Sequence, residues 1–302
     1  MLFLKLKILL QSNKKISKIC FGCEPLGGTD WGDISVPDIA NAIHRALELG
    51  VNFFDTAATY GLGLSESRLS EILGSKRHDV IIASKGGLSW EQSKNDQRAK
   101  VWKDSSPNAL RLGIESSLKR LRIDYLPIYY IHWPDPVIDI RLTFETLATL
   151  QIEGKIGKIG CSNFNAGQVD AACEASEVSY IQLALNLLNQ DLEPELRNSI
   201  RKNNISIIAY NVLANGLLTG KYNETSTFTP NDRRSRLSLF KDVALEDAIN
   251  RVSSFKKLAA IQNQSCAQYA ISKIINMPYV ESVILGIKNR TQIEENCALA
   301  EL

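Results

Sequence analysis

Four side chains in the first half of the chain could together assist the reduction of a carbonyl group. Asp55, Lys85 and His132 each stand at the end of a short apolar segment, and Tyr60 lies just after Asp55. Taken singly, each has an ordinary structural explanation, because a lone aspartate often caps a helix and a lone lysine or histidine is usually structural or solvated. Their equivalent positions at the ends of three successive segments favour a joint role in one site.

The chemistry that suits this set is proton donation to a carbonyl oxygen. A lysine beside Tyr60 favours the phenolate and is expected to lower the tyrosine pKa from its usual value of about 10. An aspartate paired with the lysine would hold it in place and keep it charged. A histidine could hydrogen-bond the same carbonyl oxygen, and a cofactor would have to supply the hydride.

Eight apolar segments predict the strands that would position these residues. They alternate with longer amphipathic stretches, and runs that are apolar on both faces are typical of parallel strands covered by helices. The segments are 16–21, 51–55, 80–84, 125–132, 156–160, 180–185, 205–209 and 282–286.

Helical spacing of apolar residues predicts helices between the strands, with four clear examples over 37–49, 107–121, 141–151 and 193–202. Alternation of strand and helix implies a parallel sheet, and eight such units imply an α/β fold of the (β/α)8 TIM barrel type, as a single domain over residues 1–302. An open, doubly wound sheet is the alternative. It would normally carry a G-x-G-x-x-G turn after its first strand, and the loop at 21–28 does not match that pattern.

The N-terminal segment MLFLKLKILL alternates apolar residues with lysines, and a polar turn over 11–14 follows it. This pattern predicts a short β-hairpin that closes the bottom of the barrel. The segment lacks the basic, apolar and cleavage regions of a signal peptide, and it is shorter than the roughly 20 apolar residues that span a bilayer. No membrane association is therefore expected.

Composition narrows the classes further. The 302 residues carry 35 Lys and Arg against 33 Asp and Glu, a balance that argues against a nucleic-acid partner. The six cysteines are scattered, which favours reduced thiols in a cytoplasmic protein. Cys20 and Cys23 form a C-x-x-C that leaves a redox role open, but no second Cys/His pair follows at zinc-site spacing, so no metal is expected.

The sequence resembles the aldo-keto reductase family in five segments that follow the family's order. They are GVNFFDTA (50–57) with Tyr60-Gly61, DYLPIYYIHWPD (124–135), GKIGKIGCSNF (154–164), IAYNVLANGLLTGKY (208–222) and GIKNRTQIEEN (286–296). The resemblance implies a barrel that binds NADP(H) and reduces an aldehyde or ketone, a class that includes sugar-type carbonyls. It also implies that Tyr60 is the proton donor, supported by Asp55, Lys85 and His132.

The same resemblance implies which residues would contact the cofactor. Ser162, Asn163 and Gln182 would hold the nicotinamide amide, and Tyr210 would stack on its ring. The pyrophosphate would lie near Leu213, Gly216, Leu217 and, with less support, Lys221. The adenosine and its 2′-phosphate would be surrounded by Gly286, Lys288, Gln292, Glu295 and Asn296, beside a last helix beginning near Thr291. Gly22 and Asp55 complete the predicted set.

Substrate-contacting candidates lie in the rim loops: Glu24, Trp31, Trp90 and Trp133. Glu24 stands where the family often has a bulky apolar residue. The basic stretch 231–236 could fold over the cofactor, recognise an anionic substrate or remain a solvated loop. Two other functions stay open, namely a cofactor-binding regulatory subunit with little turnover and a lyase or isomerase in which Lys85 forms a Schiff base.

Overall fold

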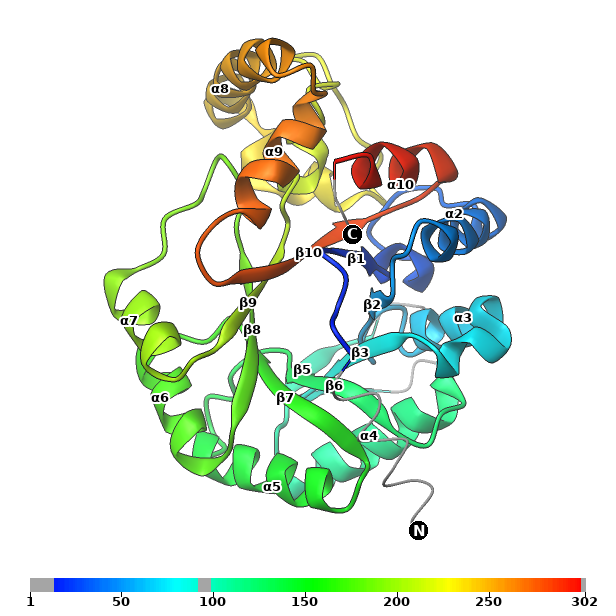
Figure 1. Ribbon diagram of the computed structural model, residues 1–302, viewed down its shortest axis with the longest axis vertical. Helices are drawn as coiled ribbons and strands as arrows, with labels where there is room; N and C mark the ends of the chain where they lie inside the picture. Colours follow the sequence, from blue (N-terminus) through cyan, green and yellow to red (C-terminus); the bar gives the residue numbers. More distant parts are fainter. Residues whose placement is uncertain (1–13, 92–98, 300–302) are drawn as a thin grey trace.

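The computed structural model describes residues 14–91 and 99–299, and these form a closed barrel of eight parallel strands (Figure 1). Around the barrel the order is β1-β10-β9-β8-β7-β6-β3-β2. The strands are β1 (Ile19–Gly22), β2 (Phe53–Asp55), β3 (Ile81–Gly86), β6 (Leu126–Ile131), β7 (Ile156–Ser162), β8 (Val178–Ala184), β9 (Ser206–Tyr210) and β10 (Val280–Gly286). The predicted (β/α)8 fold is confirmed, and each of these strands overlaps one predicted segment. The predicted N-terminal hairpin lies almost entirely outside the described residues.

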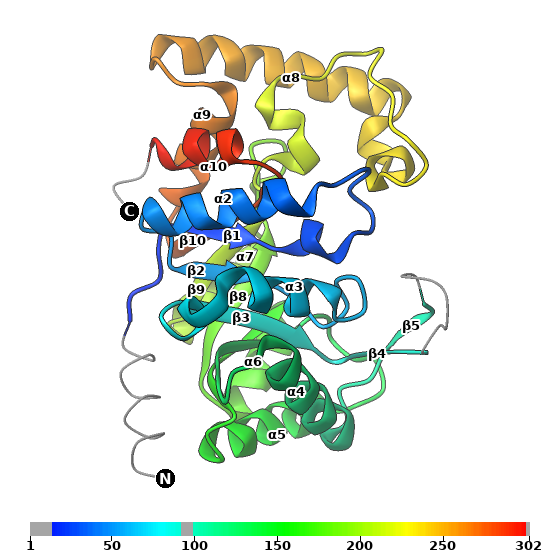
Figure 2. The same cartoon turned by 90° about the vertical axis from the view of Figure 1, so that its right-hand side faces the viewer.

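Helices surround the barrel as a ring (Figure 1). They are α2 (Val36–Glu48), α3 (Leu64–Leu73), α4 (Pro107–Leu121), α5 (Ile140–Ile152), α6 (Ala166–Ala175), α7 (Pro194–Lys202), α8 (Asp242–Ile261), α9 (Cys266–Ile275) and α10 (Arg290–Cys297). The bounds of the four helices delimited from sequence differ by no more than one residue at either end. Figure 2 shows α8 lying outside α9, at the outer end of the ring.

Two apolar layers hold the barrel together, because both faces of its strands are buried. The larger layer lies between strands and helices and includes Phe54 and Tyr129. The smaller one fills the barrel interior and includes Phe53 and Tyr130. Neighbouring residues of one strand therefore point into different layers, as the two-residue period of a strand requires.

The long connection after β3 has secondary structure of its own. It contains an antiparallel pair, β4 (Leu88–Trp90) and β5 (Val101–Lys103), in which Ser89 pairs with Trp102. Figure 2 shows this pair projecting beyond the barrel end toward which β3 points. Among the helices of the described chain, none is long and apolar enough to cross a membrane.

Candidate active site

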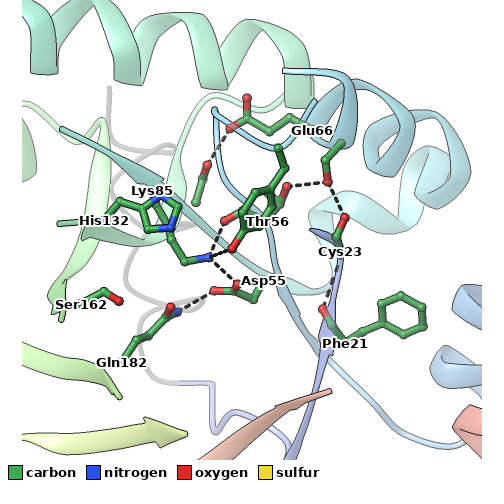
Figure 3. A network of polar contacts seen from close by, with 12 residues as sticks. Phe21, Cys23, Asp55, Thr56, Glu66, Lys85, His132, Ser162 and Gln182 are labelled. Atoms are coloured by element: carbon green, nitrogen blue, oxygen red, sulfur yellow. Dashed lines mark hydrogen bonds and ion pairs between the residues drawn. The ribbon is translucent and has the colours of Figure 1, made fainter. Parts of the chain in front are cut away.

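Three neighbouring strands bring the predicted catalytic residues to one end of the barrel (Figure 3). Asp55 is the last residue of β2, Lys85 is the last but one of β3, and His132 directly follows β6. These strands are adjacent, and their register pairs Asp55 with Ala83 and Lys85 with Tyr130. Because the carboxyl ends of parallel strands meet at one rim, the three side chains converge there.

The Lys85 ammonium is enclosed, with 2% of its side chain exposed. Its Nζ donates to the Asp55 carboxylate, to the Thr56 carbonyl oxygen at 2.9 Å and to the Tyr60 hydroxyl at 3.3 Å. An ammonium has three N–H donors and no acceptor, so these contacts can engage all of its donors. Burying this charge is tolerable because Asp55 pairs with it.

Tyr60 lies in the loop between β2 and α3, with its oxygen accepting from Lys85. The expected lowering of its pKa is wrong in direction. Burial raises the pKa of Tyr60 well above its ordinary value, and the nearby carboxylates of Glu24 and Asp55 add to this effect. The hydroxyl therefore stays protonated at neutral pH. A charged lysine can only donate, so it leaves the phenol's own hydrogen free for another acceptor.

His132 faces Tyr60 edge-on, with ring centroids 5.8 Å apart and planes at 84°. Burial, with a further contribution from the charge of Lys85, lowers the pKa of His132 to about 3. The imidazole is therefore neutral at neutral pH. Its Nδ1 is buried and has no hydrogen-bond partner among the residues described.

A buried serine fastens the loop that carries Tyr60. The hydroxyl of Ser65 donates to the Cys23 carbonyl oxygen at 2.7 Å and contacts the Thr56 hydroxyl at 2.9 Å. Its backbone N–H donates to the Tyr60 carbonyl oxygen at 3.1 Å. Thr56 in turn accepts from Lys85 through its own carbonyl. Ser65 thus links the tyrosine, the lysine and the loop after β1.

Glu66 supports the same region from behind β3, and sequence reasoning missed it. Its fully buried carboxylate accepts from Ser84 Oγ at 2.6 Å and from Arg120 Nε at 2.5 Å. Ser84 precedes Lys85 on β3, so this contact ties the first turn of α3 to the strand that carries the lysine. A signal for its burial was available in the sequence. Glu66 lies three residues before Leu69 and therefore shares the apolar face of the helix, where a carboxylate needs partners.

The residues predicted to hold a nicotinamide gather at the ends of β7, β8 and β9. Asn163 Nδ2 donates to the His132 carbonyl oxygen at 3.1 Å, and its Oδ1 accepts from the Tyr210 hydroxyl at 2.7 Å. Ser162 Oγ accepts from the same amide at 3.0 Å. Gln182 Nε2 donates to Asp55 Oδ2 at 2.6 Å, which joins this group to the catalytic candidates. The Gln182 amide nitrogen is thus engaged by the aspartate, and its carbonyl oxygen is the atom that could accept from a carboxamide.

The loop after β9 is held by its own backbone. It forms the short helix η3 (Ala214–Thr219), inside which Gly216 has a φ of 95°. The N–H of Gly216 donates to the Leu213 carbonyl oxygen at 2.8 Å, as does that of Leu218 at 3.1 Å. Gly216 therefore has no free N–H for a pyrophosphate, and any backbone contribution would have to come from another residue of the loop.

Cations gather where the 2′-phosphate was expected. Burial lowers the pKa of Lys288, and the positive charges of Arg234 and Lys221 lower it further, while Asp232 opposes them. The Lys288 ammonium donates to the Trp31 carbonyl oxygen at 2.5 Å. Gln292 accepts from the Lys288 backbone N–H at 2.8 Å. Asp33 also opposes the lowering of the Lys288 pKa, so the three cations exceed the two carboxylates that act on Lys288. A phosphate group would relieve the remaining repulsion, and these residues therefore fit one.

The other predicted cofactor residues have different surroundings. Gly22 and Gly286 are partners across β1 and β10, and a side chain on Gly286 would begin 3.2 Å from the Trp31 ring. Asn296 is buried on α10, whereas Glu295 is exposed there. The last helix begins at Arg290, one residue before its predicted start, and Asn289 caps it.

The tryptophans fall into two groups. Trp133, next to His132, is 42% exposed and has the Lys103 ammonium 5.9 Å from its ring centroid. Trp90 is on β4, in the projecting pair on the same side of the barrel. Trp31 instead has the Lys288 ammonium 5.6 Å from its ring centroid. Trp31 therefore belongs with the predicted phosphate-binding residues rather than with the β4–β5 pair.

The arginines of the basic stretch after η3 are ion-paired. Arg233 pairs with Glu24 at 2.9 Å, Arg234 with Asp232, and Arg236 with Asp30. Glu24 and Asp30 belong to the loop after β1, so this stretch is fastened across the rim.

The two cysteines of the C-x-x-C are buried in different layers, Cys20 in the barrel interior and Cys23 between strands and helices. Burial raises the pKa of both Cys20 and Cys23 well above the ordinary thiol value, and the Asp55 charge adds to the effect. Both sulfurs therefore stay protonated, which disfavours thiolate chemistry.

Comparisons with known proteins cover nearly the whole chain. A model of the Aldo/keto reductase family matches residues 18–302. The aldo-keto reductase YhdN of Bacillus subtilis (strain 168) is 32% identical over 289 residues, or 95% of this chain and 85% of that protein. The NADH-specific methylglyoxal reductase of Escherichia coli (strain K12) is 30% identical over 282 residues, or 90% and 86%. Among solved structures, the glycerol dehydrogenase AKR11B4 from Gluconobacter oxydans has a TM-score of 0.87 and 31% identity, with 96% and 88% covered. The likeness is thus not confined to the polar cluster.

Proposed function

The chain belongs to the aldo/keto reductase family, and on that premise we propose that it reduces an aldehyde or ketone to the alcohol with NADPH. The observation that carries the proposal is the buried contact of Lys85 with both Asp55 and Tyr60. Sugar-type carbonyls are part of the proposed substrate range.

Tyr60 is the proposed proton donor, because its hydroxyl is protonated and its hydrogen is not engaged by Lys85. When the proton leaves, the Lys85 ammonium stabilises the phenolate oxygen that remains. Asp55 holds the ammonium in place. Neutral His132 can donate a hydrogen bond to the carbonyl oxygen and orient it without competing as an acid.

A bound nicotinamide would supply the hydride to the carbonyl carbon, while Tyr60 supplies the proton to the oxygen. Ser162, Asn163 and the Gln182 carbonyl oxygen would hold its amide. Lys288 would bind the 2′-phosphate. Preference for NADPH is part of the proposal and rests on the cations around Lys288. Family membership alone does not support this preference, because one relative is NADH-specific.

A Schiff-base function is disfavoured by the state of Lys85. A nucleophilic lysine must be uncharged and free, whereas this one is ion-paired and donates to three oxygen partners. A regulatory subunit would not need the complete set of catalytic groups, and turnover separates that alternative from an enzyme.

The test is a panel of carbonyl compounds, including sugars and nucleotide-linked sugars, followed by the absorbance of NADPH or NADH. We expect oxidation of the cofactor with at least one compound and a preference for NADPH. Tight cofactor binding without turnover on any compound would favour the regulatory role and contradict the proposal.

A further inference from the structure

A second charged pair joins the loop after β1 to the basic stretch after η3. Arg233 donates to Glu24 Oε1 at 2.9 Å, and the side chains are 37% and 33% exposed. Glu24 begins the short helix η1 (Glu24–Gly27) after β1, and Arg233 begins η4 (Arg233–Arg236). The helix η1 packs against the loop of the candidate proton donor, because a side chain on Gly27 would begin 2.8 Å from the Tyr60 carbonyl carbon. Burial raises the pKa of Tyr60, Glu24 raises it further and Arg233 lowers it, in keeping with this placement. Both side chains of the pair are partly open to solvent.

The pair is held in place from both sides. The backbone N–H of Cys23, next to Glu24, donates to the Asp55 carbonyl oxygen at 2.8 Å. The backbone N–H of Arg233 donates to the Asp30 carbonyl oxygen at 2.9 Å. Trp31 and Asp232 add a β-bridge between the two loops. Groups fixed in this way lose little further freedom when they bind a ligand.

The charges around Tyr60 balance, and this balance favours an uncharged ligand. Glu24 and Asp55 are paired with Arg233 and Lys85, respectively, and His132 is neutral. An anionic substrate would therefore meet no excess positive charge here. After their mutual bond, Glu24 still has an accepting oxygen and Arg233 has further N–H donors. A hydroxyl group both donates and accepts, so this pair is complementary to hydroxyls.

We propose that Glu24 and Arg233 determine specificity by binding hydroxyl groups next to the reacting carbonyl, so that small polyhydroxylated aldehydes or ketones are preferred. This proposal rests on the proposed function and names its substrate class. The pair touches the substrate away from the reacting bond, so its removal should change the choice of substrate more than the chemical step.

The experiment compares glyceraldehyde with propanal, which has the same carbon skeleton without the hydroxyls. We expect wild type to favour glyceraldehyde in kcat/KM. The ratio of the two kcat/KM values should fall at least about tenfold in Arg233→Met and in Glu24→Gln, because a charge-assisted hydrogen bond is lost. Arg236→Met is the matched control, since Arg236 pairs with Asp30 on the same segment and should leave the ratio as it is.

Three results would overturn the proposal: a wild-type ratio near one, a ratio that neither variant changes, or a stronger preference for glyceraldehyde 3-phosphate that Arg233→Met removes. The last result would identify an anion site instead. Calorimetric binding of erythritol, compared with 1-butanol, gives a readout without turnover. Selective erythritol binding that Arg233→Met abolishes, in a protein that reduces no carbonyl, would support the pair and reject only the proposed function. Equal binding by wild type and variant would reject the pair.

Discussion

The two sides of the barrel mouth are built differently. On one side, Asp55, Lys85 and His132 stand on or directly after strands β2, β3 and β6, and their positions follow from the register of those strands. On the other side, Lys288 and the Glu24–Arg233 pair belong to loops that follow β10, β1 and η3. Strand ends give the chemical step a rigid arrangement, whereas loops can change in sequence without disturbing the barrel. Under the proposed function, strand ends would position the groups that surround the proton donor, whereas the connecting loops would carry Tyr60 itself and the groups for recognition.

The two sides also differ in how far their ion pairs are exposed to solvent. The Lys85–Asp55 pair is almost fully buried, so its electrostatics are strong and its disruption is costly. The Glu24–Arg233 pair is about a third exposed, and solvent and salt weaken it.

Tyr60→Phe should lower kcat by about 10²–10⁴-fold, because the proton donor is lost while the ring remains. The dissociation constant of the cofactor should change little. Tyr129→Phe is the matched control, since that buried hydroxyl has no hydrogen-bond partner among the described residues. Near-normal kcat in Tyr60→Phe would show that this hydroxyl does not supply the proton.

Lys85→Met should lower the free energy of unfolding by about 3–5 kcal/mol, because it leaves the buried Asp55 charge unpaired, and should also cripple reduction. Arg141→Met, in the exposed pair with Glu174, should cost less than about 1 kcal/mol. Urea unfolding of the two variants measures both losses of unfolding free energy. Equal losses of unfolding free energy would contradict the expected difference between buried and exposed ion pairs.

Lys288→Ala should reduce the preference for NADPH over NADH by about ten- to a hundredfold, the worth of a charge-assisted hydrogen bond. The measurement is the ratio of the two dissociation constants at fixed salt, because a partly exposed charge is screened. A wild-type ratio near one, or a ratio that the variant leaves unchanged, would reject a phosphate role for the loop side.

His132 should make stability depend on pH. The folded pKa is about 3, whereas an unfolded histidine titrates near its ordinary value of about 6.5. Above that value both states are neutral and the full stability is present. As the pH falls, the unfolded state binds a proton first, so between about pH 7 and pH 5 wild type should lose about 1–2 kcal/mol of unfolding free energy that His132→Gln does not lose. Parallel pH curves for the two proteins would contradict a buried neutral imidazole.

Several supporting contacts could not have been predicted from the sequence, because they join distant segments. Glu24 and Arg233 are 209 residues apart, and Asp55 and Gln182 are 127 apart. The β4–β5 pair was missed because its strands are only three residues long and lack a clear apolar alternation. Ser65 and Glu66 look like ordinary polar residues of a first helical turn until β3, α4 and the loop after β1 pack against them.

Local apolar periodicity is enough to predict the eight strands and four of the helices. It also predicts the rim to which Asp55, Lys85 and His132 belong, because parallel strands all end at one rim. The electrostatics of the site, in contrast, follow from the packing of distant segments. Neighbouring lysine alone predicts a lowered pKa for Tyr60, but burial and the carboxylates of Glu24 and Asp55 raise it. A pKa depends on everything packed around a group, and burial of that kind exists only after distant segments have come together.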